Sequence, residues 1–194
     1  MPTTRQVRLA ARPRGLPTAE VWEHTEEETP ALQDGEVLVE VQYLSLDPAM
    51  RGWMDDRPSY IPPVELGAVM RAGGVGTVLE SRDDRFAAGD HVSGITNAQT
   101  HAVVPADGLV KIDPSLAPLP TYLGALGMTG LTAYFGLFDV ADMQEGDTVL
   151  VSGAAGAVGS VVGQIARARG AARVVGIAGW TPVLGRSPAL TNDR

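Results

Sequence analysis

Residues 148–160, which read TVLVSGAAGAVGS, decide the fold of this chain. The β-branched run at 148–151 is typical of a buried parallel strand, and the glycines that follow it permit a sharp turn. Beyond the turn, apolar side chains recur at helical spacing, at Val161, Val162, Ile165 and Ala166. Gly170 then marks the end of a helix over 157–169, and a second short apolar run begins at residue 173. This order predicts a strand, a glycine-rich turn, a helix and a second strand at 173–177.

The glycine-rich turn predicts a nucleotide-binding site. Its glycines follow the spacing Gly-x-x-Gly-x-x-Gly, and Ala154 stands where the commoner Gly-x-Gly-x-x-Gly fingerprint has its first glycine. Such glycines let the backbone approach a pyrophosphate, which the N–H groups at the start of the helix bind. The alternative is a tight turn without a ligand, but the flanking strand and helix favour nucleotide binding. The candidate cofactor-binding residues are Ala155, Gly156, Ala157, Val158 and Gly159.

The residues after the second strand bear on the choice of cofactor. An NAD-binding unit usually has an acid about 20 residues beyond the turn, where it binds the ribose 2′-hydroxyl. Here residues 176–179 read GIAG, and the first acid after them is Asp193. The missing acid favours NADP(H) over NAD(H), and Arg186 is the basic residue available for a 2′-phosphate.

Composition limits the class of function. The chain has 194 residues, a formal net charge of −8 and 44% hydrophobic residues, which predicts a packed globular protein and disfavours a nucleic-acid binder. Its lack of cysteine excludes disulfides, thiolate nucleophiles and cysteine-ligated zinc, and is compatible with a cytoplasmic protein. The histidines, His24, His91 and His101, lack metal-ligand spacing, so we expect no metal site. The N-terminus lacks the apolar core of a signal peptide.

One uncharged stretch, residues 115–138, is long enough to span a bilayer. Two prolines and four glycines interrupt it. We therefore expect no membrane span, but a helix from Leu119 to about Asp139, buried at a domain junction where small residues allow close approach of the backbone.

The N-terminal part of the chain predicts a β-rich domain. Residues 37–43 alternate with period two, and short glycine-punctuated strands follow at 73–80, 89–94 and 101–105. Short strands at this spacing predict a small β-barrel. The acidic residues within 23–28 indicate a solvated face. The predicted division is a β-rich domain at 1–118, the first part of a dinucleotide-binding domain at 119–179 and a divergent tail at 180–194.

Several segments carry a resemblance to one family. They read LDPAMRG at 46–52, GDHV at 89–92, GLTAY at 130–134, AAGAVGS at 154–160 and VGSVVGQIA at 158–166. Together they resemble the zinc-independent medium-chain dehydrogenases/reductases. The most similar branch is that of the NADPH-dependent alkenal/enone reductases, which includes the prostaglandin reductases. The likeness covers residues 5–179.

The resemblance implies a GroES-like barrel followed by a Rossmann domain, and hydride transfer from NADPH to the C=C bond of an α,β-unsaturated ketone or aldehyde. It also implies a zinc-free site in which hydrogen bonds polarise the substrate carbonyl. Tyr60 is then the candidate catalytic hydroxyl, with a packing role as the alternative. Met128 and Thr132 would face the nicotinamide, with helix packing as the alternative. Asp47 and Arg51 would hold each other in the loop beneath it, or only brace that loop.

Two departures from the family pattern matter. Ala49 stands where many relatives have a tyrosine, which removes an aromatic wall or a hydroxyl. The likeness also stops at Gly179, so we expect a truncated chain with an incomplete Rossmann domain, about two of six strands. The alternative to an oxidoreductase is therefore a non-catalytic remnant with a partial nucleotide site. A homodimer, in which a second copy covers the unpaired edge of the incomplete sheet, is a further possibility.

Overall fold

A computed structural model describes residues 1–179 of the chain and divides it into two compact units. The first unit is Met1–Leu123, and the second begins at Gly124. The division after residue 118 stays a prediction, and the predicted tail at 180–194 lies outside the described residues.

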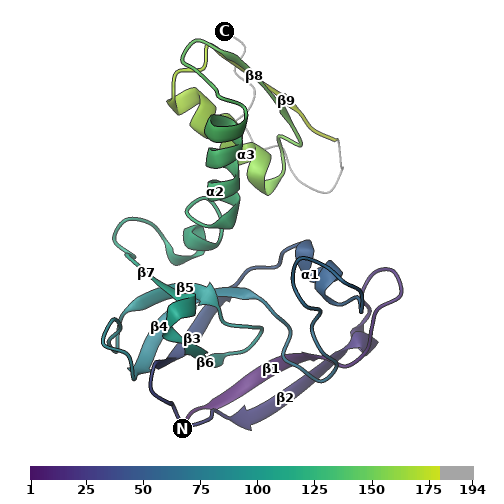
Figure 1. Cartoon of the computed structure of the whole chain (residues 1–194), viewed down its shortest axis with the longest axis vertical. Coiled ribbons are helices and arrows are strands. Elements are labelled where there is room, and N and C mark those ends of the chain that lie inside the picture. Colours follow the sequence, from purple (N-terminus) through teal and green to yellow (C-terminus); the bar gives the residue numbers. More distant parts are fainter. Residues whose placement is uncertain (180–194) are drawn as a thin grey trace. The chain divides into compact units, whose positions relative to one another are not determined.

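The first unit is built from antiparallel strands. They are β1 (Thr3–Leu9), β2 (Trp22–Glu28), β3 (Glu36–Leu44), β4 (Gly73–Ser81), β5 (His91–Ile95), β6 (His101–Pro105) and β7 (Leu109–Ile112). One sheet has the order β6-β3-β4-β5-β7, and β1 pairs with β2 in a second (Figure 1). A short helix, α1 (Ala49–Trp53), lies between β3 and β4. The predicted β-rich N-terminal domain is confirmed, and the four predicted strands all form.

The core of the five-stranded sheet follows from the alternation of apolar residues. Val37 and Val39 of β3 are fully buried and pack with Val78 of β4 and Val92 of β5. Burying one such side chain stabilises the fold by roughly 1.5–3 kcal/mol. A second apolar cluster consists of Leu9, Met54, Val64, Met70, Ala72 and Ala98. It anchors both ends of the loop that follows α1.

The acidic segment at 23–28 is exposed, as predicted, but it also forms a strand that sequence analysis missed. Strand β2 pairs antiparallel with β1, from Thr3 opposite Glu28 to Leu9 opposite Trp22. Its sequence, WEHTEEE, lacks the alternating apolar residues that reveal a strand. Pairing of its backbone with β1 holds this strand in place, and of its side chains only Trp22 packs against a core cluster.

The second unit contains the predicted strand, turn, helix and strand. Strands β8 (Thr148–Ser152) and β9 (Arg173–Ile177) pair in parallel, and α3 (Ala157–Ala168) connects them. Helix α3 packs against both strands and beside α2 (Met128–Phe135) (Figure 1). Two parallel strands joined by a helix begin a dinucleotide-binding fold, so the predicted partial Rossmann architecture is confirmed.

The helix predicted from Leu119 to about Asp139 is wrong in its first part. A 3-10 helix at Leu119–Leu123 comes first, and α2 begins only after Gly127, whose backbone is not helical (φ −124°, ψ −146°). A π-helical turn at Gly136–Val140 then extends α2. The helix is interrupted at Gly127, where glycine adopts a non-helical backbone without a steric penalty, whereas Gly130 lies inside α2. None of the helices in the described part of the chain is long and apolar enough to cross a membrane.

Candidate functional site

The glycine-rich turn joins β8 to α3 and is tied to the end of β9. Gly153 has a left-handed backbone with φ +64°, a conformation that glycine adopts without a steric penalty. Its carbonyl oxygen accepts a hydrogen bond from the Gly156 N–H at 2.8 Å. The Ala154 N–H donates to the carbonyl oxygen of Ile177 at 3.0 Å. These hydrogen bonds fix the turn relative to both strands.

Gly159 lies in close backbone contact with the turn. A Cβ at this position would overlap the Gly153 carbonyl oxygen and would lie 2.9 Å from the Ala154 Cα. A Cβ at Gly156 would be less crowded, 3.1 Å from the same oxygen. The last glycine therefore allows α3 to start directly against the strand–turn junction, as dinucleotide-binding units require.

The N-terminus of α3 presents free backbone donors. The first hydrogen bond of the helix runs from the Ser160 N–H to the Gly156 carbonyl oxygen at 3.0 Å. Helix geometry leaves the N–H groups of Ala157, Val158 and Gly159 without an acceptor inside the helix. No acidic side chain lies in this first turn to compete for them. These donors, with the positive end of the helix dipole, suit an anionic group such as a pyrophosphate.

A pocket of about 430 Å³ adjoins the turn and gives such a group room. Its lining includes Val149, Ser152, Gly153, Gly156, Val158 and Val162. Ala155, at the tip of the turn, is exposed. The predicted cofactor-binding residues at 155–159 thus span the end of the turn and the start of α3, and Gly156, Val158 and Gly159 line the pocket.

The end of β9 lacks the acid of an NAD-binding unit. The strand ends at Ile177, and the next residue, Ala178, is exposed. Residues 177–179 therefore contain no carboxylate that could accept a hydrogen bond from a ribose 2′-hydroxyl. Arg186, considered above for a 2′-phosphate, lies outside the described residues.

Met128 and Thr132 lie on one face of α2, four residues apart. Met128 is 75% exposed, and Thr132 is exposed as well. The Thr132 hydroxyl donates to the Met128 carbonyl oxygen at 2.8 Å, which ties it to its own helix. Both side chains are free to meet a ligand, and neither packs in the core of its unit.

In the first unit, the predicted ion pair between Asp47 and Arg51 is wrong. The Arg51 Nη1 lies 2.7 Å from the Asp55 carboxylate, and its other nitrogens donate to the carbonyl oxygens of Pro13 and Gly15 at 3.2 and 2.8 Å. Asp47 is half-buried and precedes α1. Arg51 therefore fastens the loop at 13–15 to α1 through these two carbonyl oxygens, and its carboxylate partner is Asp55, four residues further along the chain.

The Arg51 contact also stabilises the ionised form of Asp55. The hydrogen bond from Arg51 lowers the pKa of the Asp55 carboxyl, and the positive charges of Arg51 and Arg57 add to that effect. Since the pKa is lower in the folded chain, the contact is intact at neutral pH and is lost as the pH falls through the lowered value.

Tyr60 lies in the loop after α1 and is 82% exposed, which leaves little surface for packing. Its hydroxyl oxygen accepts a hydrogen bond from the Trp53 indole N–H at 3.1 Å. The Arg71 guanidinium lies over the Trp53 ring, 5.4 Å from its centre. Sequence reasoning missed Trp53 and Arg71, because positions 53, 60 and 71 follow no helical or strand period.

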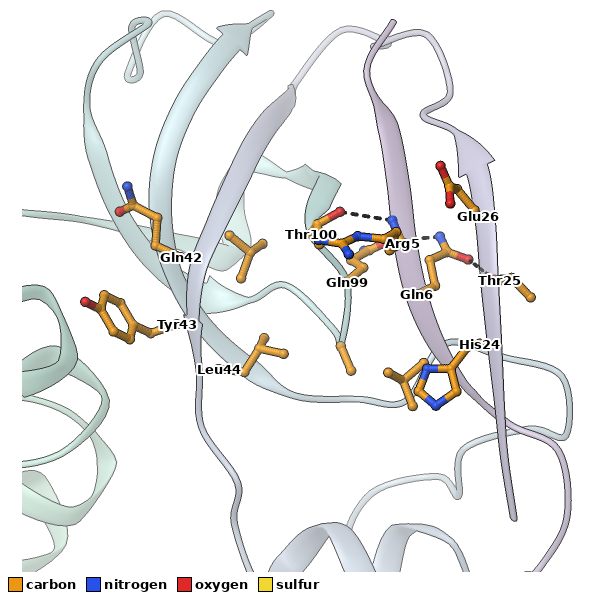
Figure 2. A pocket seen from close by; sticks show the side chains of 13 residues that line it. Arg5, Gln6, His24, Thr25, Glu26, Gln42, Tyr43, Leu44, Gln99 and Thr100 are labelled. Atoms are coloured by element: carbon orange, nitrogen blue, oxygen red, sulfur yellow. Dashed lines mark hydrogen bonds between the residues drawn. The ribbon is translucent and has the colours of Figure 1, made fainter. Parts of the chain in front are cut away.

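A further pocket, of about 540 Å³, lies between the β1–β2 pair and β3 (Figure 2). Figure 2 shows Leu44 pointing into it, and a hydrogen bond from the Arg5 N–H to the Thr100 hydroxyl at 2.9 Å on its wall. None of the predicted site residues lines it. Its walls come from segments about a hundred residues apart in sequence, so no local pattern could reveal it.

Comparisons with known proteins agree with this architecture. A family model described as the N-terminal domain of oxidoreductase matches residues 5–112. The NADPH-dependent curcumin reductase of Escherichia coli is 44% identical over 171 residues, covering 88% of this chain and 49% of that protein. Bovine prostaglandin reductase 1 is 43% identical over 168 residues, covering 85% and 49%.

A solved structure extends this similarity to three dimensions. The crystal structure of CurA from Vibrio vulnificus in complex with NADPH is 43% identical, with a TM-score of 0.80. The match covers 91% of this chain and 52% of CurA. The chain thus spans about half the length of the curated relatives it matches and is similar to them in both of its units.

Proposed function

Because the chain belongs to the zinc-independent medium-chain dehydrogenases/reductases, we propose that it serves as an NADPH-dependent oxidoreductase. The reaction is hydride transfer to the C=C bond of an α,β-unsaturated ketone or aldehyde. The relatives named above as NADPH-dependent curcumin reductase and prostaglandin reductase support this class of substrate.

The geometry of the turn at 153–159 carries the proposal. The turn brings backbone N–H groups to the start of a twelve-residue helix, beside a pocket, with no carboxylate in the first turn. In this proposal the N–H groups of Ala157, Val158 and Gly159 bind the pyrophosphate, while Ala155 and Gly156 shape the approach to it. Met128 and Thr132 contact the nicotinamide ring, and Asp47 shapes the loop on its substrate side.

Tyr60 is the proposed catalytic residue. NADPH, when bound, supplies the hydride. As hydride adds to the β-carbon, negative charge develops on the carbonyl oxygen of the substrate, and a proton from solvent then adds to the α-carbon to give the saturated product. A hydrogen-bond donor aimed at that oxygen stabilises the transition state, and in a zinc-free site a side-chain hydroxyl can supply it. The exposed Tyr60 hydroxyl has its own proton available for this purpose.

The preference for NADPH is expected to depend on the missing acid. In Ala178→Asp, the new carboxylate would repel a 2′-phosphate and accept a hydrogen bond from a 2′-hydroxyl. We expect NADPH to bind about tenfold more weakly, and NADH no more weakly than before. Titrating each cofactor against the chain and following its nicotinamide fluorescence measures both affinities.

Ala172→Asp is the matched control, because Ala172 is also exposed but precedes β9 at the other end of the strand. It should leave the ratio of affinities unchanged. Equal binding of NADPH and NADH by the unsubstituted chain would contradict the cofactor proposal.

One observation favours a second candidate, a nucleotide-binding chain without turnover. Within the described residues the β8–β9 sheet has two strands, and Leu150 and Ile177 on it are 65% and 57% exposed. A parallel sheet is normally covered on both faces. A cofactor bound only through the turn would make few contacts through its base. Its affinity for the chain and the rate of hydride transfer would then both be low.

The same exposed side chains support a homodimer as the proposed assembly, in which a second copy covers Leu150 and Ile177.

We also propose that the protein works in the cytoplasm without a metal ion, which the absence of cysteine supports. Its partner is a small carbonyl compound, since the net charge of −8 disfavours nucleic acid.

A further inference from the structure

Three side chains from separate segments meet at the exposed end of α1. The Trp53 indole N–H donates to the Tyr60 hydroxyl oxygen at 3.1 Å, and the Arg71 guanidinium covers the Trp53 ring. Arg71 also donates to the Pro62 carbonyl oxygen at 3.0 Å. The contacts form a closed path from Tyr60 through Trp53 and Arg71 back to Pro62, two residues beyond Tyr60.

The chemistry of the two aromatic groups decides where the Tyr60 proton goes. An indole N–H is a donor and accepts no hydrogen bond, whereas a phenol hydroxyl donates one and accepts others. Trp53 therefore occupies an acceptor position of the Tyr60 oxygen and cannot take its proton. Since Tyr60 is 82% exposed, the proton is directed to solvent or to a ligand.

Trp53 is itself held firmly. Its carbonyl oxygen accepts the Val64 N–H at 2.8 Å, and it packs against the cluster that contains buried Met54 and Val64. Arg12 donates to the carbonyl oxygens of Met54 and Val64 at 2.8 and 2.6 Å. The indole thus has a fixed frame, and Tyr60 takes its orientation from the indole.

We propose that Trp53, braced by Arg71, is the positioning residue that directs the Tyr60 proton at the carbonyl oxygen of an α,β-unsaturated ketone or aldehyde. This inference rests on the function proposed above and adds the means by which its donor is oriented. A donor oriented before the substrate arrives loses less conformational freedom on binding and gives a stronger, better-aligned hydrogen bond.

Infrared spectroscopy tests the proposal on the full 194-residue chain. The probe is benzylideneacetone labelled with carbon-13 at its carbonyl, whose stretching frequency falls as a hydrogen bond to the oxygen strengthens. The variants are Trp53→Phe, which keeps a ring for Arg71 but removes the N–H, and Tyr60→Phe, which removes the hydroxyl. Trp22→Phe is the control, because Trp22 packs partly buried against the same cluster without contacting Tyr60.

We expect the bound probe to show a lowered carbonyl band in the unsubstituted chain and in Trp22→Phe. In Tyr60→Phe the band should rise, and binding should weaken about fivefold, the effect of losing roughly one hydrogen bond. In Trp53→Phe the band should broaden and rise most of the way to the Tyr60→Phe value. Urea unfolding midpoints of Tyr60→Phe should stay unchanged, since an exposed hydroxyl contributes little to stability.

Two outcomes would contradict the roles of Trp53 and Tyr60 separately. A band in Trp53→Phe identical to that of the unsubstituted chain, with a raised band in Tyr60→Phe, would contradict the positioning role and leave the proposed function intact. The same band in all variants, or no bound probe in the unsubstituted chain, would contradict the role of Tyr60 and with it the positioning role of Trp53.

Discussion

Replacing Gly159 by alanine is expected to weaken NADPH binding at least about tenfold and to lower the stability of the second unit by about 3 kcal/mol. The new Cβ would meet backbone atoms, the Gly153 carbonyl group and the Ala154 Cα at 2.9 Å, which cannot rotate away as a side chain could. Either the turn opens or α3 moves away from β8, and both displace the N–H groups proposed to bind the pyrophosphate. Fluorescence titration with NADPH and urea unfolding followed by circular dichroism measure the two effects.

Gly163→Ala is the matched control within the same helix. A Cβ there would lie 3.7 Å from Val174 Cγ1, an ordinary van der Waals contact. Alanine is favoured over glycine inside a helix by about 1 kcal/mol, so this variant should bind NADPH normally and unfold at the same or a higher urea concentration. If Gly159→Ala behaved like Gly163→Ala, the turn would not have the packing role assigned to it.

The second large effect is expected in the first unit, from Gly76→Ala in β4. A Cβ at Gly76 would overlap the Glu40 carbonyl oxygen and would lie 2.9 Å from Val39 Cγ1. Gly76 is buried and lies opposite Val41 in the β3–β4 ladder. The methyl group would push β3 away and disturb the core around Val39, at a cost of about 3 kcal/mol or more. Urea unfolding of the full chain measures this loss.

Gly108→Ala controls for the loss of a glycine as such. No atom lies within 4 Å of a Cβ built at Gly108. Its effect should stay within about 0.5 kcal/mol, as for surface substitutions in general. Equal unfolding curves for the two variants would show that β3 and β4 do not need to approach so closely.

Gly159 and Gly76 lie in parts of the fold that could be predicted from the sequence. The strand–turn–helix unit around Gly159 was predicted with nearly its observed bounds, because its signals are local: a β-branched run, spaced glycines and a helical stripe. The strands that carry Gly76 and Val39 were predicted for the same reason. Their alternation is visible within a few residues.

Other elements depend on contacts that a local pattern does not contain. Strand β2 forms because its backbone pairs with β1, although its own side chains are acidic and exposed. The break before α2 arises at Gly127, within a stretch whose apolar composition alone favoured one continuous helix. In both cases tertiary or backbone constraints outweighed the pattern of side chains.

The candidate site divides in the same way. The residues at 155–159 are consecutive in the sequence, so recognising the glycine-rich turn was enough to identify them as one group. Sequence analysis expected an ion pair between Arg51 and Asp47, and the structure shows that Arg51 pairs with Asp55 instead. The contacts of Tyr60 with Trp53, and of Trp53 with Arg71, come from a loop that folds back on itself, which no spacing rule predicts.

The most direct test of the proposed reaction follows the hydride itself. The purified chain is incubated with benzylideneacetone and with NADPH that carries deuterium in place of both hydrogens at carbon 4 of the nicotinamide, and the product is analysed by NMR and mass spectrometry. We expect the saturated ketone with deuterium on the β-carbon, formed by the unsubstituted chain and in a strongly reduced amount by Gly159→Ala. Deuterium on the carbonyl carbon of an allylic alcohol, or no transfer from NADPH to either carbon, would contradict the proposed reaction.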